Sequence, residues 1–391
     1  MVAYITVVHA GEIPPEEWSA SLYLAGPTPR TDEVTSWRPQ ALAEVEKQWG
    51  DRPGLVVFVP EPRDGARWPR YDNQREWELY WGDRADCVLF WISRGPGMQG
   101  LTTNVEWGRW KDSGRVVLGT PPDAKHVRYQ RNYAADHHIA VADTLADTVG
   151  HALTALDPTA RRSGGQRHIP LLIWRTEALQ SWLRAVEGAG NELREARPEW
   201  VFRVGPRQQV VLFFVLHAAV WVATEQRLKS NEVIFSRPDI ATVLAYRRAG
   251  PVEDTHIILV KEFRTPNTAQ DGFVRELPGG SSPAGMADPR TVAAKEFTEE
   301  TGLVVDVARL RPHHARQVAA TLSTHRAHLF SIELTEAELG KLRADTAAHG
   351  EAATDTECTY VEVARLGDLV ADGTVDWNTL GAFTQVLLRG R

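Results

Sequence analysis

Short apolar stretches alternate with longer amphipathic stretches through the first 156 residues of the chain. The apolar stretches are rich in β-branched side chains and contain few polar residues, which is typical of strands buried on both faces. The stretches between them, such as 33–49 and 104–114, favour helices. Strands and helices alternating in this way predict an open, mainly parallel, doubly wound α/β sheet. The predicted strands are 21–26, 55–60, 86–92, 115–120 and 138–142.

The pattern changes twice after residue 156. Pro, Gly, Ser and Arg without periodicity mark a boundary at 157–168, and 176–196 then has the pattern of a connecting helix. From residue 198 onward, strands joined by a polar hairpin are followed by a helix, further strands and a last helix that begins after Asp376. We therefore predict an α/β domain over 1–156, a linker with a connector helix over 157–197 and an α+β domain over 198–391.

Composition limits the classes of function. The chain has 391 residues and a formal net charge of −7, which argues against general nucleic-acid binding because that needs a basic surface. Cys87 and Cys358 lie far apart, so we expect two small buried thiols in a reducing compartment and no disulfide framework. The start lacks the features of a secretory signal, and the longest apolar run, 210–223, is too short for a membrane span. We expect a soluble, cytoplasmic protein.

Three glutamates are predicted to share one face of a helix that starts after Asp288 and ends at Gly302. Asp288 is a good N-cap, and Gly302 fits the left-handed position that ends a helix. Glu296, Glu299 and Glu300 then lie side by side, where each pair of like charges costs a few tenths of a kcal/mol. Either this face is solvated, or a cation such as Mg²⁺ (or Mn²⁺) is bound there.

The sequence around these glutamates resembles the Nudix box. Residues 295–303, "KEFTEETGL", match its second half except for a lysine in place of arginine, and "VKEFRTP" (260–266) and "RELPGG" (275–280) resemble the preceding strand and turn. The resemblance covers 198–391 and implies a Nudix hydrolase that cleaves nucleoside diphosphate-linked compounds such as ADP-ribose. It further implies metal ligands at Glu296, Glu299 and Glu300, with Glu299 also catalytic, and substrate contacts at Arg264 and Glu276.

The box departs from the family pattern in two places. Met286 or Ala287 stands where the first box glutamate is expected, and Lys295 lacks the planar fork with which arginine orients carboxylates. The family often draws another catalytic glutamate from a later loop. Glu351 and Glu357 are both candidates for that role.

Three stretches before residue 111 together resemble the nucleoside 2-deoxyribosyltransferase-like family. They are "SLYLAGPTPR" (21–30), "NQREWELYWGDRADCVLFWISR" (73–94) and "GLTTNVEWGRW" (100–110), and the resemblance covers about 19–156. It implies a sheet of Rossmann or flavodoxin-like type and places the glycosyl-accepting nucleophile at Glu106. The remaining implied roles are a leaving-base contact or acid at Asp86, and substrate binding at Tyr23, Gly26 and Arg30, with Tyr23 or Trp107 stacking on a base.

Both acidic candidates have a structural alternative. Thr103 and Glu106 have the spacing of a capping box, in which the glutamate bonds back to the start of its own helix. Asp86 is equally suited to a turn at the start of a strand.

Taken together, the two resemblances predict a bifunctional, nucleotide-processing enzyme. One half breaks or transfers an N-glycosidic bond, and the other hydrolyses a diphosphate with magnesium; NAD⁺ and ADP-ribose contain both bonds. A nucleotide-binding sensor with one or both sites inactive is the main alternative, and an enzyme active only in its N-terminal half is another. We expect nucleoside or nucleotide ligands, neither polymeric nucleic acid nor membrane as a partner, and an oligomeric state compatible with a homo-oligomer.

Overall fold

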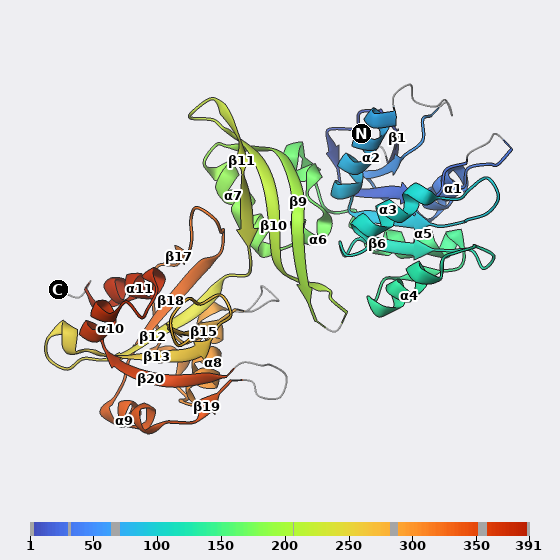
Figure 1. Ribbon diagram of the computed structural model, residues 1–391. Coiled ribbons are helices and arrows are strands. Elements are labelled where there is room, and N and C mark those ends of the chain that lie inside the picture. Colours follow the sequence, from blue (N-terminus) through green and yellow to red (C-terminus); the bar gives the residue numbers. More distant parts are fainter. Residues whose placement is uncertain are drawn as a thin grey trace. The chain divides into compact units, whose positions relative to one another are not determined.

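The computed structural model describes residues 4–29, 33–63, 71–205, 207–281, 288–350 and 358–388. The chain forms two compact units, Met1–Ser236 and Arg237–Arg391, which are described separately below (Figure 1). The sequence-based division placed the start of the second domain at residue 198, whereas residues 198–236 lie in the first compact unit.

A parallel sheet forms the centre of the first unit. Six of the described strands pair in the order β1-β4-β3-β5-β6-β7, and every pairing is parallel. From β4 to β7 this is the flavodoxin-like order, with β1 added beside β4. The predicted α/β fold is therefore confirmed for the N-terminal part. The strands are β1 (Ile5–His9), β3 (Ala20–Ala25), β4 (Leu55–Val59), β5 (Cys87–Trp91), β6 (Val116–Gly119) and β7 (Val141–Ala142).

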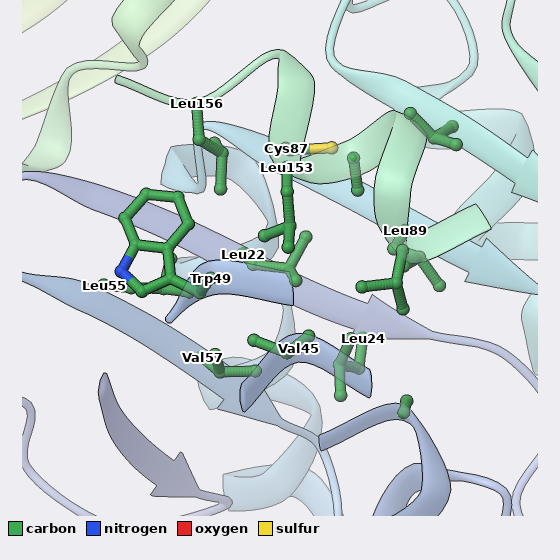
Figure 2. Close-up of a cluster of buried hydrophobic side chains, with 14 of the residues drawn as sticks. Leu22, Leu24, Val45, Trp49, Leu55, Val57, Cys87, Leu89, Leu153 and Leu156 are labelled. Atoms are coloured by element: carbon green, nitrogen blue, oxygen red, sulfur yellow. The ribbon is translucent and has the colours of Figure 1, made fainter. Parts of the chain in front are cut away.

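Helices cover both faces of this sheet, as its largely apolar strands require. One hydrophobic core lies between the sheet and helices α1 and α5, where Val45 and Trp49 meet Leu22, Leu55 and neighbouring residues (Figure 2). The other core lies between the sheet and α2, α3 and α4 and is rich in tryptophan. Full burial of one valine or leucine side chain in these cores stabilises the fold by about 1.5–3 kcal/mol. The helices are α1 (Arg38–Trp49), α2 (Tyr71–Arg84), α3 (Leu101–Trp110), α4 (Arg128–Asp136) and α5 (Leu145–Thr154).

A second, antiparallel sheet completes the first unit. Its strands pair in the order β11-β10-β9, and the long apolar run near residue 210 forms the central strand. One face of the sheet packs against α6 and α7 in a separate hydrophobic core. These elements are β9 (Glu192–Val204), β10 (Val210–Val222), β11 (Arg227–Ser236), α6 (Leu171–Trp174) and α7 (Glu177–Gly188). Two short strands, β2 (Glu17–Trp18) and β8 (Arg162–Ser163), pair with each other, and a 3-10 helix, η1, spans Gly164–His168.

The second unit has a mixed sheet with helices on both faces. Its main path is β16-β18-β12-β13-β20-β19, with β14, β15 and β17 paired beside it. Among the strands that the structure describes in this sheet, only β12 and β18 pair in parallel. Helices α8 and α9 pack on one face, and α10 and α11 on the other. The strands are β12 (Ile240–Arg247), β13 (His256–Phe263), β14 (Phe273–Glu276), β15 (Gly279–Gly280), β16 (Arg311–Pro312), β17 (Arg316–Gln317), β18 (Arg326–Glu333), β19 (Ala348–His349) and β20 (Thr359–Arg365). The helices are α8 (Pro289–Thr301), α9 (Glu336–Ala344), α10 (Leu366–Asp372) and α11 (Trp377–Leu387), with 3-10 turns η2 (Val252–Asp254) and η3 (Val307–Arg309).

The two cysteines differ in their exposure to solvent. Cys87 is buried in the first core, and burial raises the pKa of its thiol to about 12. Cys358 is exposed, so the expectation of a second buried thiol was wrong. Within the described part of the chain, no helix is both long enough and apolar enough to cross a bilayer.

Candidate active site

The candidate site lies where the order of the parallel strands reverses. The chain passes from β3 to β4 on one side and then from β4 across to β5 on the other side of β3, and ligands of open α/β sheets bind at such a point beyond the strand ends. Gly26 follows β3 with a φ of +148°, and a Cβ there would lie 2.4 Å from the carbonyl oxygen of Trp91. Only a residue without a side chain fits this close approach between the ends of β3 and β5.

Arg38 fixes a positive charge at this edge of the sheet. Its guanidinium donates to the carbonyl oxygens of Leu24 at 3.2 Å and Gly26 at 2.9 Å, and it pairs with Glu61 at 2.5 Å. The side chain is almost completely buried, and most of its donors are used. Arg38 therefore acts as a fixed charge that favours ionised carboxylates nearby.

Two glutamates lie on the helices that cover this face of the sheet. Glu106 comes from α3 and Glu78 from α2, and both are half-buried. Burial and then the charge of Glu78 raise the pKa of Glu106 to about 8, against a smaller opposing effect of Arg38. Burial also raises the pKa of Glu78, whose carboxylate accepts a 2.8 Å hydrogen bond from Gln74. Both carboxylates therefore bind a proton more readily than an exposed glutamate does.

Tyr23 is a core residue that is close enough to both carboxylates to be affected by their charge. Its ring, from β3, is fully buried and packs edge-on against Trp110 with centroids 5.4 Å apart. Its hydroxyl has no hydrogen-bond partner among the described residues, and burial together with the charges of Glu106 and Glu78 raises the pKa of Tyr23. Stacking of a base on Tyr23 or Trp107 does not fit, because both rings are enclosed by the core. The hydroxyl of Tyr23 is instead a donor available near the carboxylates.

The capping-box alternative for Glu106 is wrong. Helix α3 begins at Leu101, its N-cap is Gly100 in a left-handed conformation, and no side chain caps it. Thr103 is thus inside the helix, where it cannot act as the cap. Within the described residues, the Glu106 carboxylate has no hydrogen bond that would explain its position structurally.

Asp86 is not part of the site. It precedes β5 at the amino edge of the sheet, where its carboxylate forms a fully buried ion pair with Arg162, including a 2.8 Å contact to Oδ1. It also accepts from the backbone N–H groups of Ser21 and Leu171, each at 2.7 Å. All of its acceptor capacity is used by the protein. The structure therefore does not support contact between Asp86 and a leaving base. Asp86 instead links β3 to the segment that contains Arg162 and Leu171.

Glu78 and Arg38 were not predicted from the sequence as site residues. Glu78 stands inside the aromatic run "WELYW" (77–81), and an acidic residue among large apolar ones on a sheet-covering helix is a signal of burial. Arg38 gives no comparable signal, because its partners follow two different strands. The substrate-binding candidate Arg30 lies outside the described residues.

The glutamates of the C-terminal unit have separate surroundings. The helix is as predicted: the side chain of Asp288 caps α8, and Gly302 ends it with a φ of +66°. Glu300 is buried and accepts from the N–H of Gly279 at 2.8 Å, and a Cβ on Gly280 would lie 2.5 Å from the Glu296 carboxylate. Glu299 instead pairs with Lys295 at 3.0 Å. Two of the three predicted ligands thus meet at the glycine pair.

The predicted substrate contacts of this unit form an ion-pair cluster. Arg264 lies 2.7 Å from Glu262 and 3.3 Å from Glu276. Met286, Ala287, Glu351 and Glu357 lie outside the described residues. Among the residues that are described, no three His, Cys, Asp or Glu side chains come together as a metal site.

An open parallel sheet with two carboxylates of raised pKa near its switch point places the N-terminal domain in a class of α/β domains that bind small molecules at this edge. Residues 19–124 match the model of the family described as nucleoside 2-deoxyribosyltransferase like, which confirms the resemblance for the N-terminal domain. The comparisons give no support to a Nudix domain. No curated protein matches the chain.

Proposed function

We propose that the N-terminal domain breaks or transfers the N-glycosidic bond of a nucleoside or nucleotide. The observation that carries this proposal is the pair Glu78 and Glu106, whose pKa values are both raised beside the fixed charge of Arg38. Retaining glycosyl transfer needs one carboxylate as nucleophile and one carboxylic acid as proton donor. The match of this segment to the deoxyribosyltransferase-like family supports the same chemistry.

The proposed reaction has two steps. The reactive form of the pair is the one with the proton on Glu78 and Glu106 ionised. In that form an oxygen of the Glu106 carboxylate bonds to the anomeric carbon while the carbon–nitrogen bond to the base breaks, and the base takes the proton of Glu78. Water or a second base then attacks the same carbon, returns its proton to Glu78 and releases Glu106. The Tyr23 hydroxyl, which has no partner among the described residues, is the donor that we assign to Glu106 when that carboxylate is ionised. The variant Tyr23→Phe tests this positioning role, and we expect it to lower kcat with little change in KM.

The direct test is release of free base by the purified chain. We expect chromatography with mass spectrometry to detect base from at least one member of a panel of ribo- and deoxyribonucleosides and their 5′-monophosphates. Because the reaction uses only carboxylates, EDTA leaves it unchanged. Adding a second, different base separates transfer from hydrolysis. The proposal fails if no panel member yields base above the enzyme-free rate.

A pH profile tests the assignment of the proton pair. The wild-type kcat/KM should fall by about tenfold per pH unit above pH 8, because the last proton of the pair leaves near the Glu106 pKa of about 8. Glu78→Gln removes the group that donates this proton and the charge that raises the pKa of Glu106. We therefore expect Glu78→Gln to have a lower kcat/KM that no longer falls above pH 8. An unchanged fall above pH 8 in Glu78→Gln would mean that another group supplies the proton.

We also infer a second candidate function, magnesium-dependent hydrolysis of a nucleoside diphosphate-linked compound such as ADP-ribose by the C-terminal unit. The observation favouring it is the approach of Glu296 and Glu300 to the Gly279–Gly280 backbone, where glycine leaves space for the two carboxylates. The fit to a metal is partial, because Glu299 is paired with Lys295. A bound magnesium ion would supply charge that neutralises diphosphate oxygens, with Glu296 and Glu300 as its protein ligands.

The same product analysis separates the two functions. ADP-ribose and NAD⁺ with Mg²⁺ should yield nucleoside monophosphates, and both EDTA and Glu300→Gln should prevent this while base release continues. Calorimetry with Mg²⁺ alone measures metal binding independently of turnover. Tight nucleotide binding without any product would favour a sensor over a hydrolase.

A further inference from the structure

A basic cavity lies in the first unit, lined by residues outside the proposed catalytic pair. Its volume is about 260 Å³, below the 300–1,000 Å³ typical of drug-sized ligands. Residues after α3, after α4 and near the β9–β10 turn line it, and its charged or titratable members are Lys111, Asp112, His137, His138, Arg203 and Arg207. The cavity therefore combines a small volume with an excess of cationic groups.

The single carboxylate of this group is already neutralised. Lys111 pairs with Asp112 at 2.5 Å, and the hydroxyl of Tyr133 donates to the same carboxylate. Asp112 thus offers no full negative charge to the arginines. The two histidines add further donors at the rim.

Arg203 is the group that most clearly lacks a counter-ion. Its guanidinium donates only to Gln208, to the backbone oxygen at 3.2 Å and to the side-chain oxygen at 3.3 Å, and both acceptors are neutral. Neither Arg203 nor Arg207 forms an ion pair within the described ranges. Burial lowers the pKa of Arg203, against a smaller opposing effect of Asp112. A partly desolvated guanidinium without a carboxylate is electrostatically incomplete.

The backbone provides the space that Arg203 occupies. Gly114 has a φ of +76°, and a Cβ at this position would lie 2.6 Å from the central guanidinium carbon of Arg203. A side chain at residue 114 would displace the arginine. The glycine turn at residue 114 and strand β9 thus together position the Arg203 guanidinium at the cavity wall.

We propose that this cavity binds the phosphate group of a small molecule, as inorganic phosphate or as a sugar phosphate. Arginine forms bidentate, charge-assisted hydrogen bonds with phosphate oxygens, and Arg207 adds positive charge around the same space. The net negative charge of the chain makes a polymeric nucleic acid a poor occupant. This site is independent of the proposed N-glycosidic chemistry.

Calorimetric titration of the full chain with inorganic phosphate and with ribose 5-phosphate, in phosphate-free buffer, tests the proposal. We expect saturable binding of at least one ligand with a Kd below about 1 mM. Arg203→Gln should weaken binding by about tenfold or more, as loss of a charged hydrogen-bond donor predicts. Arg207→Gln, an exposed position, should weaken it in the same direction without affecting folding.

Arg197→Gln is the matched control, because Arg197 also lies on β9 but pairs with Glu199 and does not line the cavity. Binding within about twofold of wild type is expected there. Equal affinity for both ligands assigns the site to the phosphate group itself, and preference for ribose 5-phosphate assigns it to a sugar phosphate. The absence of saturable binding by either ligand up to about 10 mM, a concentration that corresponds to negligible affinity, overturns the proposal. The proposal is also overturned if Arg197→Gln weakens phosphate binding as much as Arg203→Gln does.

Discussion

Glu106→Gln should abolish base release by the N-terminal domain while leaving the fold intact. We expect kcat/KM to fall by at least about 10³-fold, equivalent to about 4 kcal/mol of transition-state stabilisation, because an amide cannot form the covalent bond to the sugar. Stability should not decrease. The raised pKa of Glu106 means that the site disfavours its charge, and the amide is a neutral group of the same shape. Base release by mass spectrometry and urea unfolding measure the two effects.

Glu76→Gln serves as the control for this substitution. Glu76 lies on α2 two residues before Glu78 but is exposed, so the same chemical change should alter the rate by less than about twofold. Rapid quenching of wild type with substrate should also show a glycosyl mass on the peptide that contains Glu106. An active Glu106→Gln enzyme, or a glycosyl adduct on another residue, would contradict the assignment of the nucleophile.

Elements whose signals are local were predictable from the sequence. Strands β3, β4 and β5 are buried on both faces, and their uninterrupted apolar runs identify them without knowledge of the fold. The limits of α8 were predicted from Asp288 and Gly302, because capping chemistry depends only on neighbouring backbone groups. The nucleophile candidate Glu106 came from the family resemblance, and the structure adds the raised pKa.

Features that depend on distant residues were missed or misassigned. The partner of Asp86 is Arg162, 76 residues later, and no local pattern connects them. The role of Glu78 depends on its proximity to Glu106, which arises only when two helices pack on the same face of the sheet. Thr103 and Glu106 have the spacing of a capping box, but the box does not form because the helix already begins at Leu101.

The largest loss of stability is expected for Asp86→Asn. This change leaves the guanidinium of Arg162 fully buried without its counter-ion, and breaking a buried ion pair from one side costs about 3–5 kcal/mol. The cost should appear as a lower free energy of unfolding of the first unit. Tryptophan fluorescence during urea unfolding reports on that unit, because all but one of the tryptophans precede residue 237.

Two further variants separate this explanation from a catalytic role of Asp86. Glu177→Gln removes one partner of the exposed pair with Arg184 and should cost less than about 1 kcal/mol, because solvent screens such pairs. The double variant Asp86→Asn/Arg162→Met removes both charges and should recover part of the lost stability, since no unpaired ion remains. Folded Asp86→Asn should retain base release within about tenfold of wild type, a smaller loss than the 10²–10⁴-fold contribution of a general acid. A stable but inactive Asp86→Asn protein would instead make Asp86 the proton donor that the sequence first indicated.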